Sequence, residues 1–247
     1  RHPRRIPGSA SRVLTVLGAD VPAPPSTCGQ PSGWDDGRVP SVLPDGDPVP
    51  PDGSLPASAL TGRERTPLAF YVHVPFCRVR CGYCDFNTYT AEELGGGASR
   101  TSYAETAARE VALARQVLAG DRREVDTVFF GGGTPTLLPP RDLGRILHAI
   151  RTEFGLAADA EVTTEANPDS VDLADLVELR EAGFTRLSFG MQSAVPSVLA
   201  TLDRSHDPER VPLVVEWARQ AGFEQVSLDL IYGTPGESAS DWETTLA

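Results

Sequence analysis

Residues 181–192, Glu-Ala-Gly-Phe-Thr-Arg-Leu-Ser-Phe-Gly-Met-Gln, contain the end of a helix, a glycine that stops it and a complete strand. The same order returns 39 residues later, where Gln-Ala-Gly-Phe at 220–223 precedes a second apolar run. Glycine commonly ends a helix because it adopts the left-handed backbone conformation without steric cost. A repeated junction of helix, stop and strand predicts a repeated βα module.

Apolar runs of strand length alternate with helical stretches from residue 67 onward and predict five βα units. The expected strands are 68–74, 125–130, 161–166, 186–192 and 225–232. In the helix after the first strand, Ser102 and Glu105 have the spacing of a capping box. Parallel strands joined by right-handed helical crossovers form either an open sheet or a barrel.

The side-chain pattern of the strands decides between these two folds. In 186–192 the odd positions are apolar and the even ones are mostly polar or small, and three other strands divide in the same way. An open sheet with helices on both sides would be apolar on both faces. A barrel-like sheet with helices outside and a polar lumen fits better. Only 125–130, with Phe129 and Phe130, lacks the pattern. We predict an α/β partial barrel, truncated after about five βα units.

The composition excludes several classes of function. All 22 basic residues of the 247 are arginine, which excludes a lysine Schiff base and a P-loop lysine. The 34 acidic residues give a net charge of −12, which argues against a nucleic-acid partner. No run reaches the roughly 18 apolar residues that a membrane span needs. Contact with a membrane surface is left open.

Residues 1–66 have a different composition from the rest of the chain. They hold 12 of the 22 prolines and a single aromatic residue, Trp34. Such a segment buries too little apolar surface to offset the entropy of ordering it. We therefore expect a disordered, Pro-rich tail at 1–66 and a core domain at 67–247. An export signal at 13–19, after Arg4-Arg5, is an alternative, but the apolar stretch is short and Asp20 follows it.

Three of the four cysteines, Cys77, Cys81 and Cys84, directly follow the first expected strand. Parallel barrels place their chemistry at this end of their strands. A structural zinc site uses four closed ligands, and no fourth Cys or adjacent His completes the set here. An iron–sulfur cube bound by three Cys instead leaves one iron open. The spacing favours the cluster over zinc; Cys28 lies apart in the predicted tail.

Other residues that are able to bind a ligand lie at the ends of the remaining strands. Residues 131–133 are three glycines, so backbone groups there can approach a ligand closely. Glu165 and Asp229 end otherwise apolar strands, where a buried carboxylate is costly unless it is paired. The partner could be a ligand ammonium, ribose hydroxyls or an arginine. For Asp229 a structural pair with a neighbouring arginine is the simpler alternative.

Taken together, these segments resemble the radical S-adenosylmethionine (radical SAM) superfamily, and within it the oxygen-independent coproporphyrinogen III oxidase-like family. The resemblance spans residues 67–236. Besides Cys81 and Cys84, it is carried by the segments YVHVPFC at 71–77, GGGTPT at 131–136, TTEANP at 163–168, LSFGMQ at 187–192 and LDLIYG at 228–233.

The resemblance implies a partial (β/α)6 radical SAM barrel with a [4Fe–4S] cluster on the three cysteines. S-adenosyl-L-methionine (SAM) would chelate the open iron and, on receiving an electron, yield a 5′-deoxyadenosyl radical. The implied cofactor contacts are Tyr71, Gly132, Gly133, Thr134, Glu165, Gln192, Arg204 and Asp229. No catalytic residue is implied. His73 and His206 either contact a tetrapyrrole or are ordinary polar residues.

One position divides the family. Two residues after the third cysteine the oxidases carry a fourth, whereas this chain has Phe86. This pattern resembles the haem-chaperone (HemW-type) branch. It implies a cytoplasmic protein that binds haem or a related porphyrin, transfers haem to an acceptor protein and receives electrons for its cluster from a donor. The alternative is oxidative decarboxylation of coproporphyrinogen III to protoporphyrinogen IX.

The chain is expected to be a piece of a longer protein. Its only methionine is Met191, and residues 240–247 have the pattern of a helix that has just begun. The family's barrel has six parallel strands, one more than predicted here. We therefore expect the edge of the last strand to be unpaired, which favours aggregation.

Overall fold

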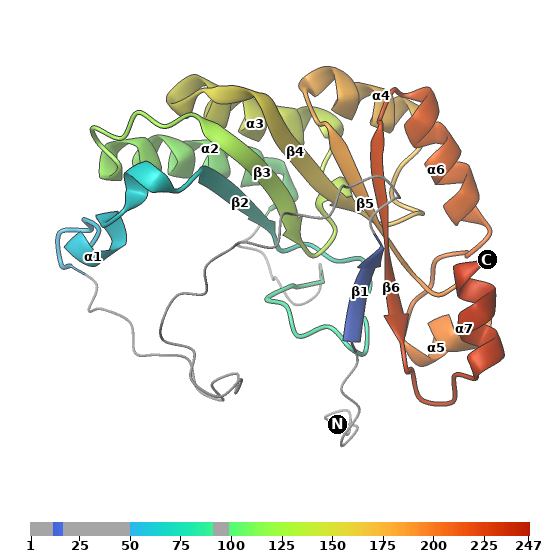
Figure 1. The fold of residues 1–247 in the computed structure, drawn as a ribbon. Helices are drawn as coiled ribbons and strands as arrows, with labels where there is room; N and C mark the ends of the chain where they lie inside the picture. Colours follow the sequence, from blue (N-terminus) through green and yellow to red (C-terminus); the bar gives the residue numbers. More distant parts are fainter. Residues whose placement is uncertain (1–11, 17–49, 91–98) are drawn as a thin grey trace.

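The computed structural model describes residues 12–16, 50–90 and 99–247, and one sheet organises them (Figure 1). Its strand order is β1-β6-β5-β4-β3-β2. Five strands are parallel, as predicted. They are β2 (Leu68–Val74), β3 (Val125–Gly132), β4 (Leu156–Ala166), β5 (Arg186–Gln192) and β6 (Gln225–Tyr232). Only β3 and β4 are longer than expected.

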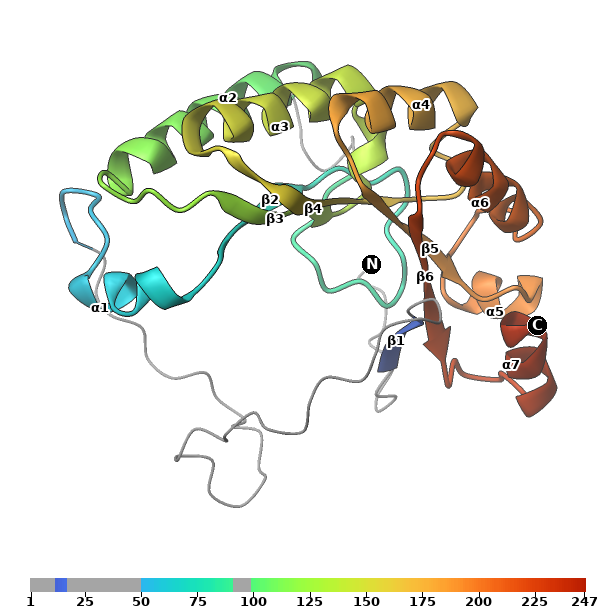
Figure 2. The same ribbon diagram turned by 45° about the horizontal axis from the view of Figure 1, so that its top comes forward.

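The main helices cover the convex side of this arched sheet (Figures 1 and 2). They are α2 (Arg100–Val117), α3 (Pro140–Phe154), α4 (Leu173–Ala182) and α6 (Arg210–Gln220). The short helices α5 (Pro196–Thr201) and α7 (Ala239–Leu246) lie beside β6. This arrangement confirms the predicted partial barrel. In the described parts of the chain, no helix combines the length and apolarity needed to cross a membrane.

The alternation along the strands separates a packed outer face from a polar inner face. Leu187 and Phe189 are fully buried in the outer core. The two aromatic residues of β3 divide between the faces, which explains the missing alternation there. Phe130 packs against Phe184 in the outer core at 5.1 Å between ring centroids. Phe129 stacks on Tyr71 at 6.1 Å on the inner face.

The repeated junction has the same structure in both copies. Gly183 and Gly222 follow α4 and α6 with φ of 108° and 89°. In each copy an arginine of the helix, Arg180 or Arg219, donates through Nη1 to the carbonyl oxygen four residues on. The glycine turns the chain and the arginine binds a carbonyl beyond it, so each helix leads directly into the next strand.

Helix α2 begins earlier than predicted. Ser99 is its N-cap and accepts a hydrogen bond from the backbone N of Thr101 at 3.2 Å. Ser102 lies inside the first turn and donates to the carbonyl oxygen of Ser99. The predicted capping box of Ser102 and Glu105 is therefore wrong. Serine is favourable at either position, so propensity alone did not locate the cap.

Two parts of the predicted tail have regular structure. Strand β1 (Arg12–Val16) pairs antiparallel with β6, from Arg12 opposite Tyr232 to Val16 opposite Leu228. It covers the edge that we expected to be unpaired; free backbone groups there offer hydrogen-bond partners to a β-prone segment. Further on lie α1 (Ala57–Leu60) and the 3-10 helix η1 (Arg63–Arg65). Residues 1–11 and 17–49 of the predicted tail lie outside the described residues.

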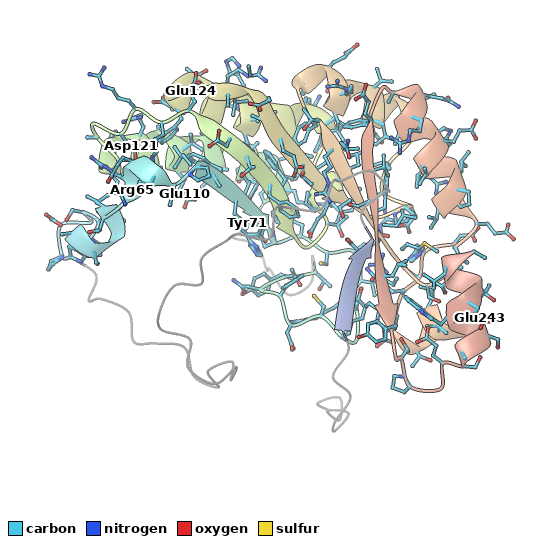
Figure 3. All side chains as sticks on the ribbon, in the orientation of Figure 1. Arg65, Tyr71, Glu110, Asp121, Glu124 and Glu243 are labelled. Carbon is cyan, nitrogen blue, oxygen red and sulfur yellow. The ribbon has the colours of Figure 1, made fainter. Side chains whose placement is uncertain are left out.

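An arginine connects the N-terminal end of the sheet to this preceding segment. Arg123 Nη2 lies 2.6 Å from the carboxylate of Asp121, whose side chain is 3% exposed. Arg123 Nη1 donates to the carbonyl oxygens of Arg63 and Thr66 at 2.8 and 2.9 Å. Asp121 and Arg65 of η1 are labelled in this part of Figure 3. The contacts hold η1 against the loop that precedes β3.

Candidate cluster and cofactor site

Residues 75–90 form a loop at the C-terminal end of β2 whose two ends are joined. Phe76 pairs with Tyr89, and Cys77 N donates to the carbonyl oxygen of Tyr89 at 3.0 Å. Phe76 is buried and meets the ring of Tyr103 of α2 edge-on at 5.4 Å. The base of the loop is thereby anchored in the core, and the cysteine-bearing part projects from this base.

The three cysteines of the loop lie around one cavity. Cys77, Cys81 and Cys84 are free, partly buried thiols, and all three line a cavity of about 560 Å³. Burial raises the pKa of the Cys77 thiol, and negative charge on the other two thiols raises it further, while Thr88 and Arg204 lower it. The thiols therefore influence one another electrostatically. Cys28 lies outside the described residues.

The three thiols that line the cavity are of the kind and number that an iron–sulfur cluster with one open iron needs. Within the described ranges, no three His, Cys, Asp or Glu side chains converge to form a site for one metal ion. A zinc site needs ligands that converge on one point. In an iron–sulfur cube each cysteine binds a different iron, so its ligands surround a larger centre. Three separated thiols around a cavity match this second requirement.

The glycine segment after β3 packs directly against the cysteine loop. Gly133 N donates to the carbonyl oxygen of Val74, and Thr134 N donates to that of Phe76, both at 2.8 Å. A Cβ on Gly133 would lie 2.4 Å from the Phe76 oxygen and 2.9 Å from Cys77 Sγ. Glycine is required here because any side chain would overlap the loop.

Glu165, near the end of β4, presents a carboxylate in the cavity. Its Oε2 accepts a hydrogen bond from Gly132 N at 3.0 Å. Burial raises the pKa of Glu165 to about 7; the Gly132 N–H lowers it, and the negative charge of Asp229 raises it. A carboxylate that is costly to ionise gains from an incoming cation or hydrogen-bond donor. Glu165 therefore suits contact with a positively charged or hydroxyl-bearing ligand.

The second carboxylate, Asp229 on β6, is hydrogen-bonded to serine. Ser188 Oγ lies 3.1 and 3.2 Å from its two oxygens. Burial raises the pKa of Asp229, while Ser188 and the charge of Arg186 lower it. The ion pair of Arg186 is with Glu161, at 3.6 Å. Arginine thus acts on Asp229 through charge, and the hydrogen bond comes from Ser188.

Arg204 connects four parts of the site. Its Nη2 donates to Asn167 Oδ1 and to the carbonyl oxygen of Gly190, both at 2.8 Å. Its Nη1 lies 3.5 Å from Cys81 Sγ. Its Nε donates to His206 Nδ1 at 3.3 Å. These contacts tie the ends of β4 and β5 to the cysteine loop.

The two histidines have structural partners. Burial and then the charge of Arg204 lower the pKa of His206 to about 4, so its neutral ring accepts the hydrogen bond from Arg204. His73 Nε2 lies 2.9 Å from the carbonyl oxygen of Asn87, and its Nδ1 lies 3.1 Å from Tyr71 Oη. His206 therefore helps to hold Arg204, and His73 joins β2 to the cysteine loop.

Most of the predicted site residues meet at the one cavity. Its lining includes the three cysteines and seven of the eight predicted cofactor contacts: Gly132, Gly133, Thr134, Glu165, Gln192, Arg204 and Asp229. Tyr71 lies on the same inner face but is not part of the lining, and its side chain is 60% exposed (Figure 3). Its ring stacks on Phe129, which does line the cavity. The cofactor-binding roles themselves stay predictions.

The end of β5 is irregular where it reaches the cavity. Gln192 has a φ of 64°, and the register with β6 shifts between Gly190 and Gln192. A left-handed conformation is uncommon for a non-glycine residue, and such conformations cluster at functional sites. The irregularity marks the point at which β5 stops pairing regularly and contributes to the cavity wall.

Sequence analysis gave no role to three residues of the cavity wall. Asn167 lies two positions after Glu165, Ser188 lies on the polar face of β5, and Tyr83 lies between two cysteines. Burial raises the pKa of the Tyr83 hydroxyl. Proximity to residues already singled out was the available signal for all three. Asn167 is bonded to Arg204 and Ser188 to Asp229, both distant in the sequence, so these contacts were not readable from spacing.

Comparison with protein families identifies the family to which this fold belongs. The family described as the Radical SAM superfamily matches residues 71–247. This chain belongs to the radical SAM superfamily. Its membership implies a [4Fe–4S] cluster and SAM, and the thiols around the cavity, the glycine segment and Glu165 fit those groups.

Radical SAM relatives of this chain include haem chaperones and an oxidase. The heme chaperone HemW of Mycobacterium tuberculosis H37Rv is 52% identical over 176 residues, covering 71% of this chain and 44% of that protein. HemW of Escherichia coli K12 is 37% identical over 175 residues, covering 71% and 45%. The oxygen-independent coproporphyrinogen III oxidase of Synechocystis PCC 6803 is 34% identical over 183 residues, covering 74% and 38%.

A solved radical SAM structure has the same fold. The coproporphyrinogen III oxidase HemN of Escherichia coli matches with a TM-score of 0.65 and 33% identity, over 73% of this chain and 40% of that one. This chain thus spans less than half the length of each relative named here.

Proposed function

We propose that this chain is the cluster- and SAM-binding part of a haem chaperone of the HemW type. The observation that carries the proposal is the 52% identity to a HemW, against 34% to an oxygen-independent coproporphyrinogen III oxidase. Phe86 agrees with it, because this phenylalanine stands where the oxidase pattern has a fourth cysteine. Its side chain is 62% exposed and lines the cavity.

In this proposal different residues around the cavity bind the cluster and the SAM ligand. Cys77, Cys81 and Cys84 hold the cluster, which together with SAM supplies one-electron chemistry when bound. Gly132 and Gly133 line the cavity and carry no side chain, so a ligand can approach their backbone closely. Glu165 and Asp229 accept hydrogen bonds from the amine or hydroxyls of the ligand, which offsets the cost of burying both carboxylates.

The cargo in this proposal is haem. Val79 and Phe86 are 47% and 62% exposed, and both line the cavity that the cysteines surround. Exposed apolar side chains beside a cavity offer contact area for a flat, largely apolar tetrapyrrole. The protein would act in the cytoplasm, receive electrons from a donor protein and transfer haem to an acceptor protein. The net charge of −12 disfavours nucleic acid as a partner.

The test compares haem binding with turnover on anaerobically reconstituted protein. Haem is titrated and followed by its absorbance. Coproporphyrinogen III is supplied with SAM and a reductant, and the samples are afterwards oxidised in air so that any protoporphyrinogen formed is detected as fluorescent protoporphyrin. We expect stoichiometric haem binding and no protoporphyrin. The matched variant Phe86→Ala should weaken haem binding without loss of iron. Absence of haem binding would contradict the proposal.

The second candidate is oxygen-independent coproporphyrinogen III oxidase. The fold match to HemN, with a TM-score of 0.65 and 33% identity, favours it. Sustained protoporphyrin formation in the same assay would establish the oxidase instead of the chaperone. The variant Phe86→Cys restores the thiol of the oxidase pattern, so any gain of turnover in this variant would identify residue 86 as the position that divides the two functions.

A further inference from the structure

We propose that Arg204 sets the reduction potential of the iron–sulfur cluster by donating a charged hydrogen bond to the sulfur of Cys81. The same hydrogen bond holds the cysteine loop in position. The proposal rests on membership of the radical SAM superfamily and not on the haem-chaperone function.

The guanidinium of Arg204 is held in a fixed orientation. Nη2 has two acceptors at 2.8 Å, Asn167 Oδ1 and the carbonyl oxygen of Gly190, and Nε has His206 Nδ1 at 3.3 Å. The guanidinium is planar, so these three contacts also fix Nη1. Nη1 lies 3.5 Å from Cys81 Sγ, within the usual reach of a hydrogen bond to sulfur.

The segment before Arg204 contacts the cysteine loop independently. Gly82 N donates to the carbonyl oxygen of Leu202 at 3.2 Å. A Cβ on Gly82 would lie 2.6 Å from Asp203 Oδ2, and Asp203 itself has a φ of 53°. Residues 202–204 therefore bind the loop at two consecutive positions, 81 and 82. This double contact brings Arg204 to one particular cysteine.

Among the residues that the structure describes, no carboxylate is bonded to Arg204. Its four acceptors are an amide oxygen, a backbone oxygen, a neutral imidazole and the sulfur of Cys81. When Cys81 binds iron its sulfur is a thiolate, and the contact becomes a charge-assisted hydrogen bond. By comparison, Cys84 has the neutral hydroxyl of Thr88 at 4.0 Å.

Hydrogen bonds to cluster sulfurs favour the reduced state, because reduction adds negative charge to the cluster. Arg204 should therefore raise the potential of the cluster and ease its reduction. The effect acts through the protein alone, so it should exist before SAM binds. This property separates the proposal from a role of Arg204 that is limited to contacting SAM.

The experiment is a redox titration of reconstituted full chain in the absence of SAM, followed by electron paramagnetic resonance. In Arg204→Gln the equilibrium between reduced and oxidised cluster should shift about tenfold toward the oxidised form, which is about 59 mV for one electron. Iron and sulfide content are measured on the same samples. Arg204→Lys keeps the charge without the planar fork and should shift the equilibrium less.

Two further variants separate the hydrogen bond from general electrostatics. Asn167→Leu removes one acceptor that orients Arg204 and should lower the potential by a smaller amount. Arg78→Gln removes a charge next to Cys77 that is 64% exposed and faces Asp169 at 3.7 Å, so water screens it and the potential should stay unchanged.

The outcomes are distinct. Loss of iron in Arg204→Gln together with a lowered potential in Asn167→Leu would support both the positioning and the tuning role. An unchanged potential in every Arg204 or Asn167 variant that retains iron would overturn the proposal. Equal shifts in Arg204→Gln and Arg78→Gln would overturn it as well, because charge alone would then explain the effect.

Discussion

Two arginines, Arg123 and Arg204, each join several segments, but they do so at opposite ends of the barrel. Arg123 lies at the N-terminal end of the strands and pairs with the nearly buried carboxylate of Asp121 at 2.6 Å. Arg204 lies at the C-terminal end, and its four acceptors in the described parts of the chain are uncharged when Cys81 is a free thiol. The charge of Arg123 is therefore compensated by a carboxylate, whereas the charge of Arg204 is not compensated by any of its acceptors.

The difference agrees with the separate roles of the two ends of parallel barrels. Contacts at the N-terminal face of such barrels serve stability, and those at the C-terminal face serve chemistry. A compensated arginine such as Arg123 can only hold segments together. An uncompensated one such as Arg204 destabilises the free protein slightly and favours an anionic group beside it. The predictions that follow substitute residues at one end of the barrel and compare the effects on iron binding and on the free energy of unfolding.

The largest effect is expected from removing the thiols. In the triple variant Cys77→Ala, Cys81→Ala and Cys84→Ala, iron and sulfide after anaerobic reconstitution should fall to background. The unfolding free energy of the cofactor-free chain should change by no more than about 1 kcal/mol, because the thiols are only partly buried. Cys28→Ala is the control and should retain full iron. Retention of iron by the triple variant would contradict the assignment of the cluster.

The next effect concerns the opposite end. Asp121→Ala breaks a largely buried pair and should cost about 3 kcal/mol of unfolding free energy. Folded protein should still bind iron normally. The control Glu105→Ala breaks the exposed pair with Arg109, at 3.2 Å, and should cost less than about 0.5 kcal/mol. Equal losses in chemical denaturation would show that Arg123 and Asp121 do not hold the N-terminal end together.

The pH dependence of this pair has a definite sign. Hydrogen bonding to Arg123 lowers the pKa of Asp121 to about 2, below the usual value of 3.8. A carboxyl whose pKa is lowered by folding stabilises the fold when the pH is above the pKa of the unfolded chain. This contribution is lost as the pH falls from 3.8 toward 2. The wild-type chain should therefore lose stability over this range, and Asp121→Ala should lose less.

Glu165 should show a pH dependence of the opposite sign. Burial raises its pKa from 4.5 to about 7, so ionised Glu165 destabilises the free chain increasingly as the pH rises through this window. Glu165→Gln should stabilise the cofactor-free protein by about 3 kcal/mol at a pH of about 8 and by almost nothing at a pH of about 4. Glu161→Gln, on the same strand and half-exposed, is the control. A destabilised Glu165→Gln at high pH would mean that a positive partner already compensates this carboxylate.

The elements that were predicted correctly are those whose signals are local. The strands β2, β5 and β6 have the predicted bounds because each alternates apolar and polar residues between clear stops. The three cysteines and the glycine segment were singled out by their spacing, and the structure places them at one cavity, while their binding roles stay predictions. Glu165 and Asp229 were singled out because carboxylates are unusual at the ends of apolar strands, and both line the cavity.

The remaining features depend on contacts distant in sequence. Arg204 Nη1 and Cys81 Sγ are 123 positions apart, and the structure shows a contact that the cysteine spacing does not contain. Likewise β1 pairs with β6 across more than 200 residues, so composition alone suggested a tail there. Ser99 was missed as the cap of α2 because Ser102 offers the same chemistry three positions later.

The smallest effect is expected at the mouth of the cavity, where Arg78 and Asp169 lie 3.7 Å apart. Both line the same cavity as Arg204. They therefore test whether a charged pair at the C-terminal end of the barrel contributes to the unfolding free energy. Arg78 is 64% exposed, and an exposed pair at this distance is screened by water and ions. A double-mutant cycle of Arg78→Gln and Asp169→Asn should give a coupling below about 0.5 kcal/mol in chemical denaturation. A coupling above about 1 kcal/mol would show that stability is also built at the C-terminal end, and the contrast between the two arginines would then reflect their partners and not their positions.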